Sequence, residues 1–117
     1  MKRLFTIAAL SVMTLGLVSC KAGQSYYNSA ISDLKSRMKD PTSLIVNNAT
    51  GYYVKKDGSE SWACRINYNG KNSYGAYAGS SNVYYYLSGG AVKYSGTDSV
   101  MYTLISMQDG AQLVTYA

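Results

Sequence analysis

The clearest structural signal in the sequence is a strict two-residue alternation over residues 61–69. Its apolar members are Trp62, Cys64, Ile66 and Tyr68. Because successive side chains of a strand point to opposite faces of a sheet, this pattern predicts a strand with one buried and one solvent-facing side. Residues 82–88 repeat the alternation and place Tyr84 and Tyr86 on the opposite side from Val83, Tyr85 and Leu87.

Several shorter segments predict further strands around this one. Residues 44–47, 52–54, 73–77 and 91–94 are each rich in aliphatic or aromatic side chains, which favour extended backbone. Asp57-Gly58 and Asn69-Gly70 are dipeptides typical of tight hairpin turns. The strands are therefore expected to form an antiparallel sheet.

One amphipathic helix is predicted before the strands. Its apolar residues are Tyr27, Ile31, Leu34 and Met38. This spacing places them along one side of about four helical turns. Pro41 disfavours helical geometry at Asp40, so the helix is expected to end there.

Residues Ser99–Met107 fit two structures. Val100, Tyr102 and Leu104 alternate as in a strand, whereas a helix there would be capped by Asp98 and end near Gly110. The β-branched and tyrosine content favours the strand. The fold class is thus predicted to be α+β, with one N-terminal amphipathic helix packed on an antiparallel sheet of four to six strands.

The first twenty residues have the pattern of an export signal. Two cations, Lys2 and Arg3, precede an apolar run over residues 4–18, which is shorter than the roughly 20 apolar residues of a membrane-spanning helix. A basic start, a short apolar centre and a small residue before the cut are typical of signal peptides. The run ends in Leu17-Val18-Ser19-Cys20, which resembles the lipobox of bacterial lipoproteins.

The lipobox resemblance implies that the Cys20 thiol receives diacylglycerol and that a peptidase cuts the chain before it. Two or three acyl chains anchor a protein stably to a bilayer. Residues 1–19 are then a lipoprotein signal peptide, residues 20–25 a lipidated tether and residues 26–117 a single small domain. The membrane becomes the first expected partner, and the cell envelope, facing away from the cytoplasm, the expected location. Because Lys21 rather than aspartate follows Cys20, sorting to the outer membrane is permitted in a Gram-negative host.

Charge gives little support for nucleic-acid binding. The net charge of +5 falls to +3 when Lys2 and Arg3 leave with the signal peptide. No run of lysine or arginine in the remaining chain exceeds the pair Lys55-Lys56, whereas nucleic-acid-binding domains gather such residues into patches. We therefore expect no nucleic-acid partner.

Cysteine and histidine usage argues against a catalytic site. A lipidated Cys20 leaves Cys64 without an intramolecular partner, so it is read as a buried apolar residue, or less readily as an intermolecular bridge. The chain has no histidine, the commonest general base and metal ligand. A carboxylate pair of Asp57 and Glu60 would lie in an exposed hairpin, and no nucleotide-binding motif is present. We expect no enzymatic activity, no cofactor and no metal.

Two segments carry a second resemblance. Asp40-Pro41-Thr42-Ser43-Leu44 follows the predicted helix, and Asn72-Ser73-Tyr74-Gly75-Ala76 follows the central strand. The pair resembles a group of small secreted or lipid-anchored bacterial and phage proteins. The resemblance covers residues 31–87, with Met38 and Ala76 where leucine and glycine are common. Many members have no assigned activity, so it implies the fold and transfers no catalytic residue.

Tyrosine is unusually frequent in the chain, with thirteen tyrosines against one phenylalanine. Tyrosine suits recognition surfaces because its ring offers apolar area and a hydroxyl at low entropic cost, although it is also simply a good strand former. We select Tyr74, Tyr77, Tyr84 and Tyr86 as candidate contacts. The leading hypothesis is a non-catalytic binding module for an envelope protein or a glycan. The alternatives are a self-associating structural protein of the envelope and a small inhibitor of a cell-wall hydrolase.

Overall fold

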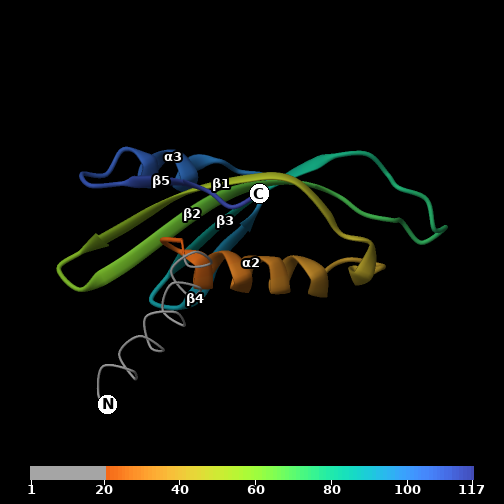
Figure 1. The fold of residues 1–117 in the computed structure, drawn as a ribbon, viewed down its shortest axis with the longest axis horizontal. Helices are drawn as coiled ribbons and strands as arrows, with labels where there is room; N and C mark the ends of the chain where they lie inside the picture. Colours follow the sequence, from red (N-terminus) through yellow and green to blue (C-terminus); the bar gives the residue numbers. More distant parts are fainter. Residues whose placement is uncertain (1–20) are drawn as a thin grey trace, which may run out of the picture.

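A five-stranded antiparallel sheet with one helix on each side forms the part of the chain that the computed structural model describes, residues 21–117 (Figure 1). The strands are β1 (Ile45–Lys56), β2 (Ser59–Asn69), β3 (Ser81–Ser88), β4 (Ala91–Gly96) and β5 (Gln112–Thr115). Their order across the sheet is β4-β3-β2-β1-β5. The α+β prediction is confirmed. The expected signal peptide and Cys20 lie outside the described residues.

Helix α2 (Gln24–Ser36) lies below the sheet in Figure 1 and covers its apolar side. Tyr26, Ala30 and Leu34 are its buried residues, and Tyr27, Ile31 and Met38 pack beside them. The predicted apolar side is therefore found, with its centre shifted toward Tyr26 and Ala30. A short 3-10 helix, η1 (Pro41–Ser43), connects α2 to β1.

We call the side of the sheet that packs against α2 the closed face. Its fully or almost fully buried side chains are Trp62, Cys64 and Ile66 of β2 and Tyr85 and Leu87 of β3. The predicted alternation of faces is found on both strands and the burial of Cys64 is confirmed, but Ala63, expected to face solvent, is buried under the second helix on the opposite side. At roughly 25 cal/mol per Å² of apolar surface removed from water, this packing is the main source of stability.

The turn between β1 and β2 matches the sequence prediction, whereas β1 is longer than predicted. Asp57 and Gly58 have φ values of 53° and 80°, as the favoured two-residue hairpin turn requires at both central positions. The two strand candidates at 44–47 and 52–54 are parts of the single strand β1, whose ladder with β2 is irregular between Val46 and Asn48. This irregularity leaves Asn47 outside the ladder.

The slight preference for a strand over Ser99–Met107 is wrong, because the segment forms helix α3 (Val100–Ser106). The Asp98 carboxylate accepts a hydrogen bond from the Val100 amide at 2.9 Å. Ile105 is buried against Val54 and Ala63 on the side of the sheet opposite α2. Burial of this one side chain and an acidic residue before the first turn outweigh the strand propensity of the segment.

The expected strand over residues 73–77 is a loop, and its only ladder contact is an isolated bridge between Lys71 and Tyr77. Hydrogen bonds within the loop, made by Asn72, take the place of strand pairing. The Asn72 side-chain oxygen accepts hydrogen bonds from the amides of Tyr74 (2.9 Å) and Ala76 (3.2 Å). Asparagine stabilises turns in this way. Strand β5, which the sequence did not suggest, pairs with the free edge of β1.

The start of the described chain is tied to strand β5. Lys21 donates a hydrogen bond from Nζ to the Thr115 carbonyl at 2.7 Å, and the Tyr116 hydroxyl donates to the Ala22 carbonyl. Helix α2 begins at Gln24, so residues that we assigned to the tether belong to the first turn of the helix.

Candidate functional site

Helix α3 covers only part of the side of the sheet that it packs on (Figure 1). It contacts the end near the β1–β2 hairpin, through Val54 and Ala63. Beyond it, the strands carry polar side chains that no helix covers, and Tyr84 lies at the border, where its ring contacts Tyr102 of α3. We call this uncovered part the open face and define it by Asn47, Thr50, Arg65, Asn67, Asn82 and Tyr84. All six are partly or largely exposed.

Three asparagines form a row across strands β1, β2 and β3. Asn47 donates a hydrogen bond from Nδ2 to Oδ1 of Asn67 at 2.8 Å, and Asn67 donates from Nδ2 to Oδ1 of Asn82 at 2.8 Å. Asn47 Nδ2 also lies 3.1 Å from Oγ of Ser80. Each amide is oriented by its neighbour, so the row is fixed before any ligand arrives.

A second row, made of tyrosine rings, crosses the sheet beside the asparagines. Tyr102 of α3 makes edge contacts with Tyr52 and Tyr84, with ring centroids 5.3 and 5.6 Å apart. Burial raises the pKa of Tyr102, the neighbouring Tyr52 raises it further, and the nearby Arg65 charge lowers it. The Tyr102 hydroxyl therefore stays neutral at physiological pH. Rings in such edge-to-face contacts hold a defined orientation.

Arg65 lies between the two rows on β2, where its register partners are Thr50 and Tyr84. The one ion pair within residues 21–117 joins Arg37 to Asp33, so Arg65 has no carboxylate partner there. An arginine side chain carries five N–H donors and a permanent charge. The open face thus offers an unpaired guanidinium between amides and rings.

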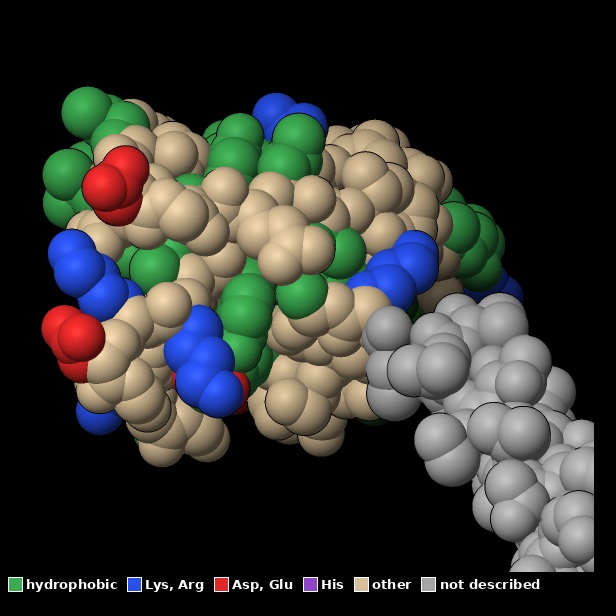
Figure 2. Space-filling model, turned by 60° about the vertical axis from the view of Figure 1, so that its left-hand side comes forward, with side chains coloured by type: hydrophobic (Ala, Val, Ile, Leu, Met, Phe, Trp, Pro, Cys, Tyr) green, Lys and Arg blue, Asp and Glu red, His purple; other side chains and the backbone are tan. Residues whose placement is uncertain are grey.

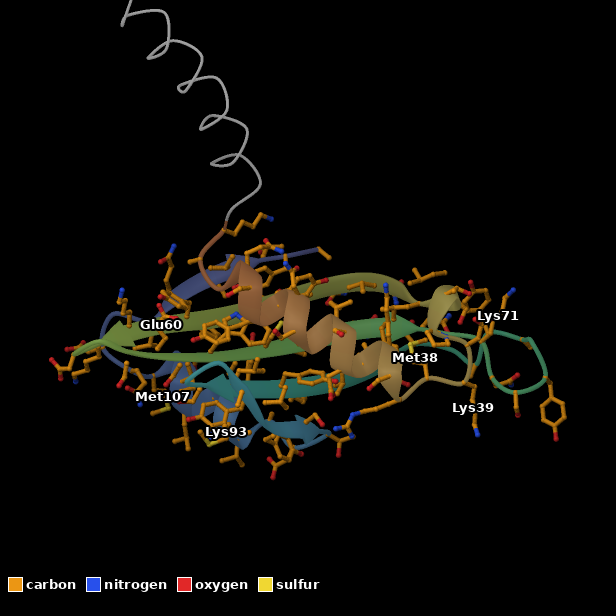
Figure 3. All side chains as sticks on the ribbon, turned by 90° about the horizontal axis from the view of Figure 1, so that it is seen from below. Met38, Lys39, Glu60, Lys71, Lys93 and Met107 are labelled. Carbon is orange, nitrogen blue, oxygen red and sulfur yellow. The ribbon has the colours of Figure 1, made fainter. Side chains whose placement is uncertain are left out.

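The loop over residues 70–80 extends from the end of the sheet opposite Glu60, as the position of Lys71 in Figure 3 shows. Tyr74, near its tip, is 93% exposed. Lys71 Nζ lies 5.6 Å from the ring centroid of Tyr77, within the range of a cation–π contact. This ordered loop therefore presents one uncovered ring.

The structure does not bring the four candidate tyrosines together. Tyr74 and Tyr77 lie on the loop, and Tyr84 lies on the open face. Tyr86 packs with the buried group around Ile105 under α3, so our choice of Tyr86 as a contact conflicts with its position. Alternation correctly placed it on the same side as Tyr84, but it could not show that a helix covers that stretch.

Sequence reasoning missed the asparagines and Arg65. The signal that could have found them was already present, because the alternation over residues 61–69 places Arg65 and Asn67 on the solvent-facing side. Asn82 continues that side on β3. Their junction with Asn47 depends on the strand register and the irregularity in β1, which the sequence does not specify.

Glu60, considered above as a member of a carboxylate pair, is held by two tyrosines on the α2 side. Its oxygens accept hydrogen bonds from the hydroxyls of Tyr26 and Tyr53, both at 2.8 Å. These bonds, that from Tyr26 first, lower the pKa of Glu60, while burial raises the pKa of Tyr26 to about 12. A shallow hollow of about 280 Å³ adjoins Glu60 and Tyr26. The Glu60 carboxylate is thus ionised, and each of its oxygens already accepts a hydrogen bond.

Two further features bear on chemistry. Burial raises the pKa of the Cys64 thiol, which keeps it protonated and a weak nucleophile. Within residues 21–117, no three side chains of the metal-binding types gather into a cluster. On the side shown in Figure 2, lysine and arginine side chains are scattered over the surface.

Comparison of the chain with family models, curated proteins and solved structures found no match. Neither helix of the described chain has the length and apolar character needed to cross a bilayer.

Proposed function

We propose that this protein is a lipid-anchored, non-catalytic binding module of the bacterial cell envelope, and that its open face holds the ligand. The observation that carries the proposal is the pair of ordered rows on this side of the sheet: asparagine amides beyond the end of α3, and beside them tyrosine rings at the border of α3, which itself supplies Tyr102. Polar side chains fixed by their neighbours lose little conformational freedom on binding, which favours affinity.

Anchoring is supported by the lipobox Leu17-Val18-Ser19-Cys20. Lys21, the residue after Cys20, is tied to the edge strand β5. A lipid on Cys20 would therefore hold the domain close to the bilayer, with the β5 edge nearest. The anchoring proposal is tested by mass spectrometry of the protein from its natural host. The account requires a chain that begins at Cys20 with an acylated thioether, and an intact leader would contradict it.

Binding is tested by photo-crosslinking in living cells. A benzoylphenylalanine replaces Tyr84 on the open face or, as the matched control, Ser29 on the exposed side of α2. We expect covalent adducts from position 84 and none from position 29. Equal yields from both positions would contradict the proposal. The mass of the adduct distinguishes a glycan from a protein, and an adduct with a cell-wall hydrolase would indicate an inhibitor.

Self-association is the second candidate function, and the surface of α3 favours it. Val100, Leu104 and Met107 are 55%, 48% and 74% exposed, an uncommon exposure for large apolar side chains on so short a helix. A concentration series in analytical ultracentrifugation tests this candidate. A monomer at the highest concentration would remove it, and loss of a dimer in Leu104→Ser would support it.

A further inference from the structure

We infer that the ligand of the open face is a glycan of N-acetylated amino sugars that also bears carboxylate groups. This inference rests on the proposed function, because it names the chemistry recognised by the same face. Three features carry it: the free ends of the asparagine row, the unpaired charge of Arg65 and the exposed parts of the tyrosine rings.

The asparagine row is complementary to an acetamido group. Within the described hydrogen bonds, the row leaves Oδ1 of Asn47 free to accept and both N–H groups of Asn82 Nδ2 free to donate. An acetamido group carries one donor and one acceptor in a plane, and a sugar hydroxyl can serve as either. A chain of such sugars along the sheet would therefore satisfy both ends of the row.

Arg65 adds a requirement for negative charge. The acids of the described chain are Asp33, Asp40, Asp57, Glu60, Asp98 and Asp109, and none is a residue of the open face. A guanidinium binds a carboxylate through two parallel hydrogen bonds. Since Arg65 is half-buried between Thr50 and Tyr84, part of its hydration is already lost, which strengthens such a pair.

The rings supply the apolar part of the site. Tyr84 and Tyr102 are half-buried, so each keeps exposed ring area beside Arg65. Amphipathic rings of this kind accommodate the C–H side of a sugar while their hydroxyls stay in water.

A protein partner fits this face less well. The cores of protein interfaces are depleted in charge and rich in apolar anchors, but the exposed aliphatic side chains of this domain lie elsewhere, on α3 among other places. Nucleic acid is disfavoured too, because affinity for it grows with the number of phosphates neutralised, and the open face has a single cation.

The test uses the protein purified from membranes and reconstituted in nanodiscs. Isothermal titration calorimetry is performed with two probes of equal length. One is a glycan strand of alternating N-acetylglucosamine and N-acetylmuramic acid with the peptides removed, so that its carboxylates are free. The other is the neutral chitin oligosaccharide. We expect the acidic strand to bind more tightly than the chitin oligosaccharide.

Matched variants locate the binding. Asn67→Ala should weaken both probes about tenfold, since it removes the centre of the row. Arg65→Gln should weaken only the acidic strand, to the level of chitin, and Arg65→Lys should recover part of the difference. Ser29→Ala on α2 should change nothing. Unchanged circular-dichroism spectra and melting temperatures establish that each variant is folded.

Binding of the acidic strand that is as strong in Asn67→Ala and in Arg65→Gln as in the unmodified protein would overturn the inference. So would the absence of binding by both probes. If position 84 still crosslinked to a protein in cells, the proposed function would stand and only the glycan would be wrong. If neither probe bound and position 84 gave no crosslink in cells, the proposed function would be wrong as well.

Discussion

The two faces of the sheet are built from the same strands but differ in how much of each is covered by a helix. On the closed face, α2 covers Ile66 and Tyr85, which are almost fully buried. On the opposite side, α3 covers the sheet only near the hairpin, and the neighbours Arg65 and Tyr84 stay partly exposed. The comparison teaches that one alternating sequence can build a buried core on one side of a sheet and leave polar side chains exposed on the other. Substitutions on the two sides should therefore separate stability from binding.

The largest expected effect is on the closed face. Ile66→Ala removes a side chain with no exposed surface, and such truncations cost about 2–5 kcal/mol because a cavity remains. Urea denaturation measures the loss in the free energy of unfolding. A cost below about 1 kcal/mol would mean that the closed face is not the main core.

Two neighbouring tyrosines give a sharper comparison. Tyr85 donates a hydrogen bond from its hydroxyl to Oδ2 of Asp33 at 2.7 Å, so Tyr85→Phe should cost about 1–3 kcal/mol, as for other bonds to charged groups. Tyr84→Phe, on the open face, should change stability by less than about 0.5 kcal/mol. Thermal melts of both variants check the difference. Equal costs would contradict the division between the faces.

Acid should lower the stability of the folded state through two carboxylates on the closed face. Burial alone would raise the pKa of Asp33, but hydrogen bonds from Tyr85 and Arg37 outweigh it and leave this pKa lowered. Hydrogen bonds from Tyr26 and Tyr53 lower that of Glu60. Carboxylates with a lower pKa in the folded state stabilise it above their unfolded values, and this stability is lost as the pH falls through the folded values. Melting temperatures should therefore drop below about pH 4.

The control for this pH dependence is a variant on each side of the sheet. Glu60→Gln should make the decline with acid shallower, because one of the two titrating groups is gone. Arg65→Gln should leave the shape of the curve unchanged, since the residues of the open face include no carboxylate. A curve flattened by Arg65→Gln would reveal an acidic partner of Arg65.

A small change in stability is also expected from the asparagine row. Asn67→Ala removes two exposed hydrogen bonds and should cost less than about 1 kcal/mol. Urea denaturation at neutral pH checks this value. A cost near that of Ile66→Ala would make the row a structural element and would remove the reason to read it as a site.

Sequence reasoning recovered those parts of the fold that depend on local pattern. The alternation over residues 61–69 predicted the buried side of β2, and Asp57-Gly58 predicted the hairpin turn, because side-chain periodicity and backbone angles are local properties. The α3 segment was misread since its fate depends on one tertiary contact, Ile105 against Val54 and Ala63. Strand propensity cannot anticipate such a contact.

The candidate site was harder to predict than the fold. The alternation placed both Tyr84 and Tyr86 on the outer side of β3, but it could not show that Tyr86 packs with the group around Ile105 under α3. The row of Asn47, Asn67 and Asn82 joins three strands through a register that includes the irregularity near Val46. Residues far apart in sequence meet only when that register is set, so no local pattern marks them.

The central claim, that the open face is occupied in the cell envelope, is tested most directly by thiol protection. Buried Cys64 should not react, so a maleimide reports on the introduced thiol of Thr50→Cys, at a position of the open face with no assigned ligand contact, or, as control, of Ser29→Cys. We expect Thr50→Cys to react more slowly in isolated envelopes than in the purified protein and Ser29→Cys to react equally in both. Equal rates for Thr50→Cys in the two preparations would contradict the claim.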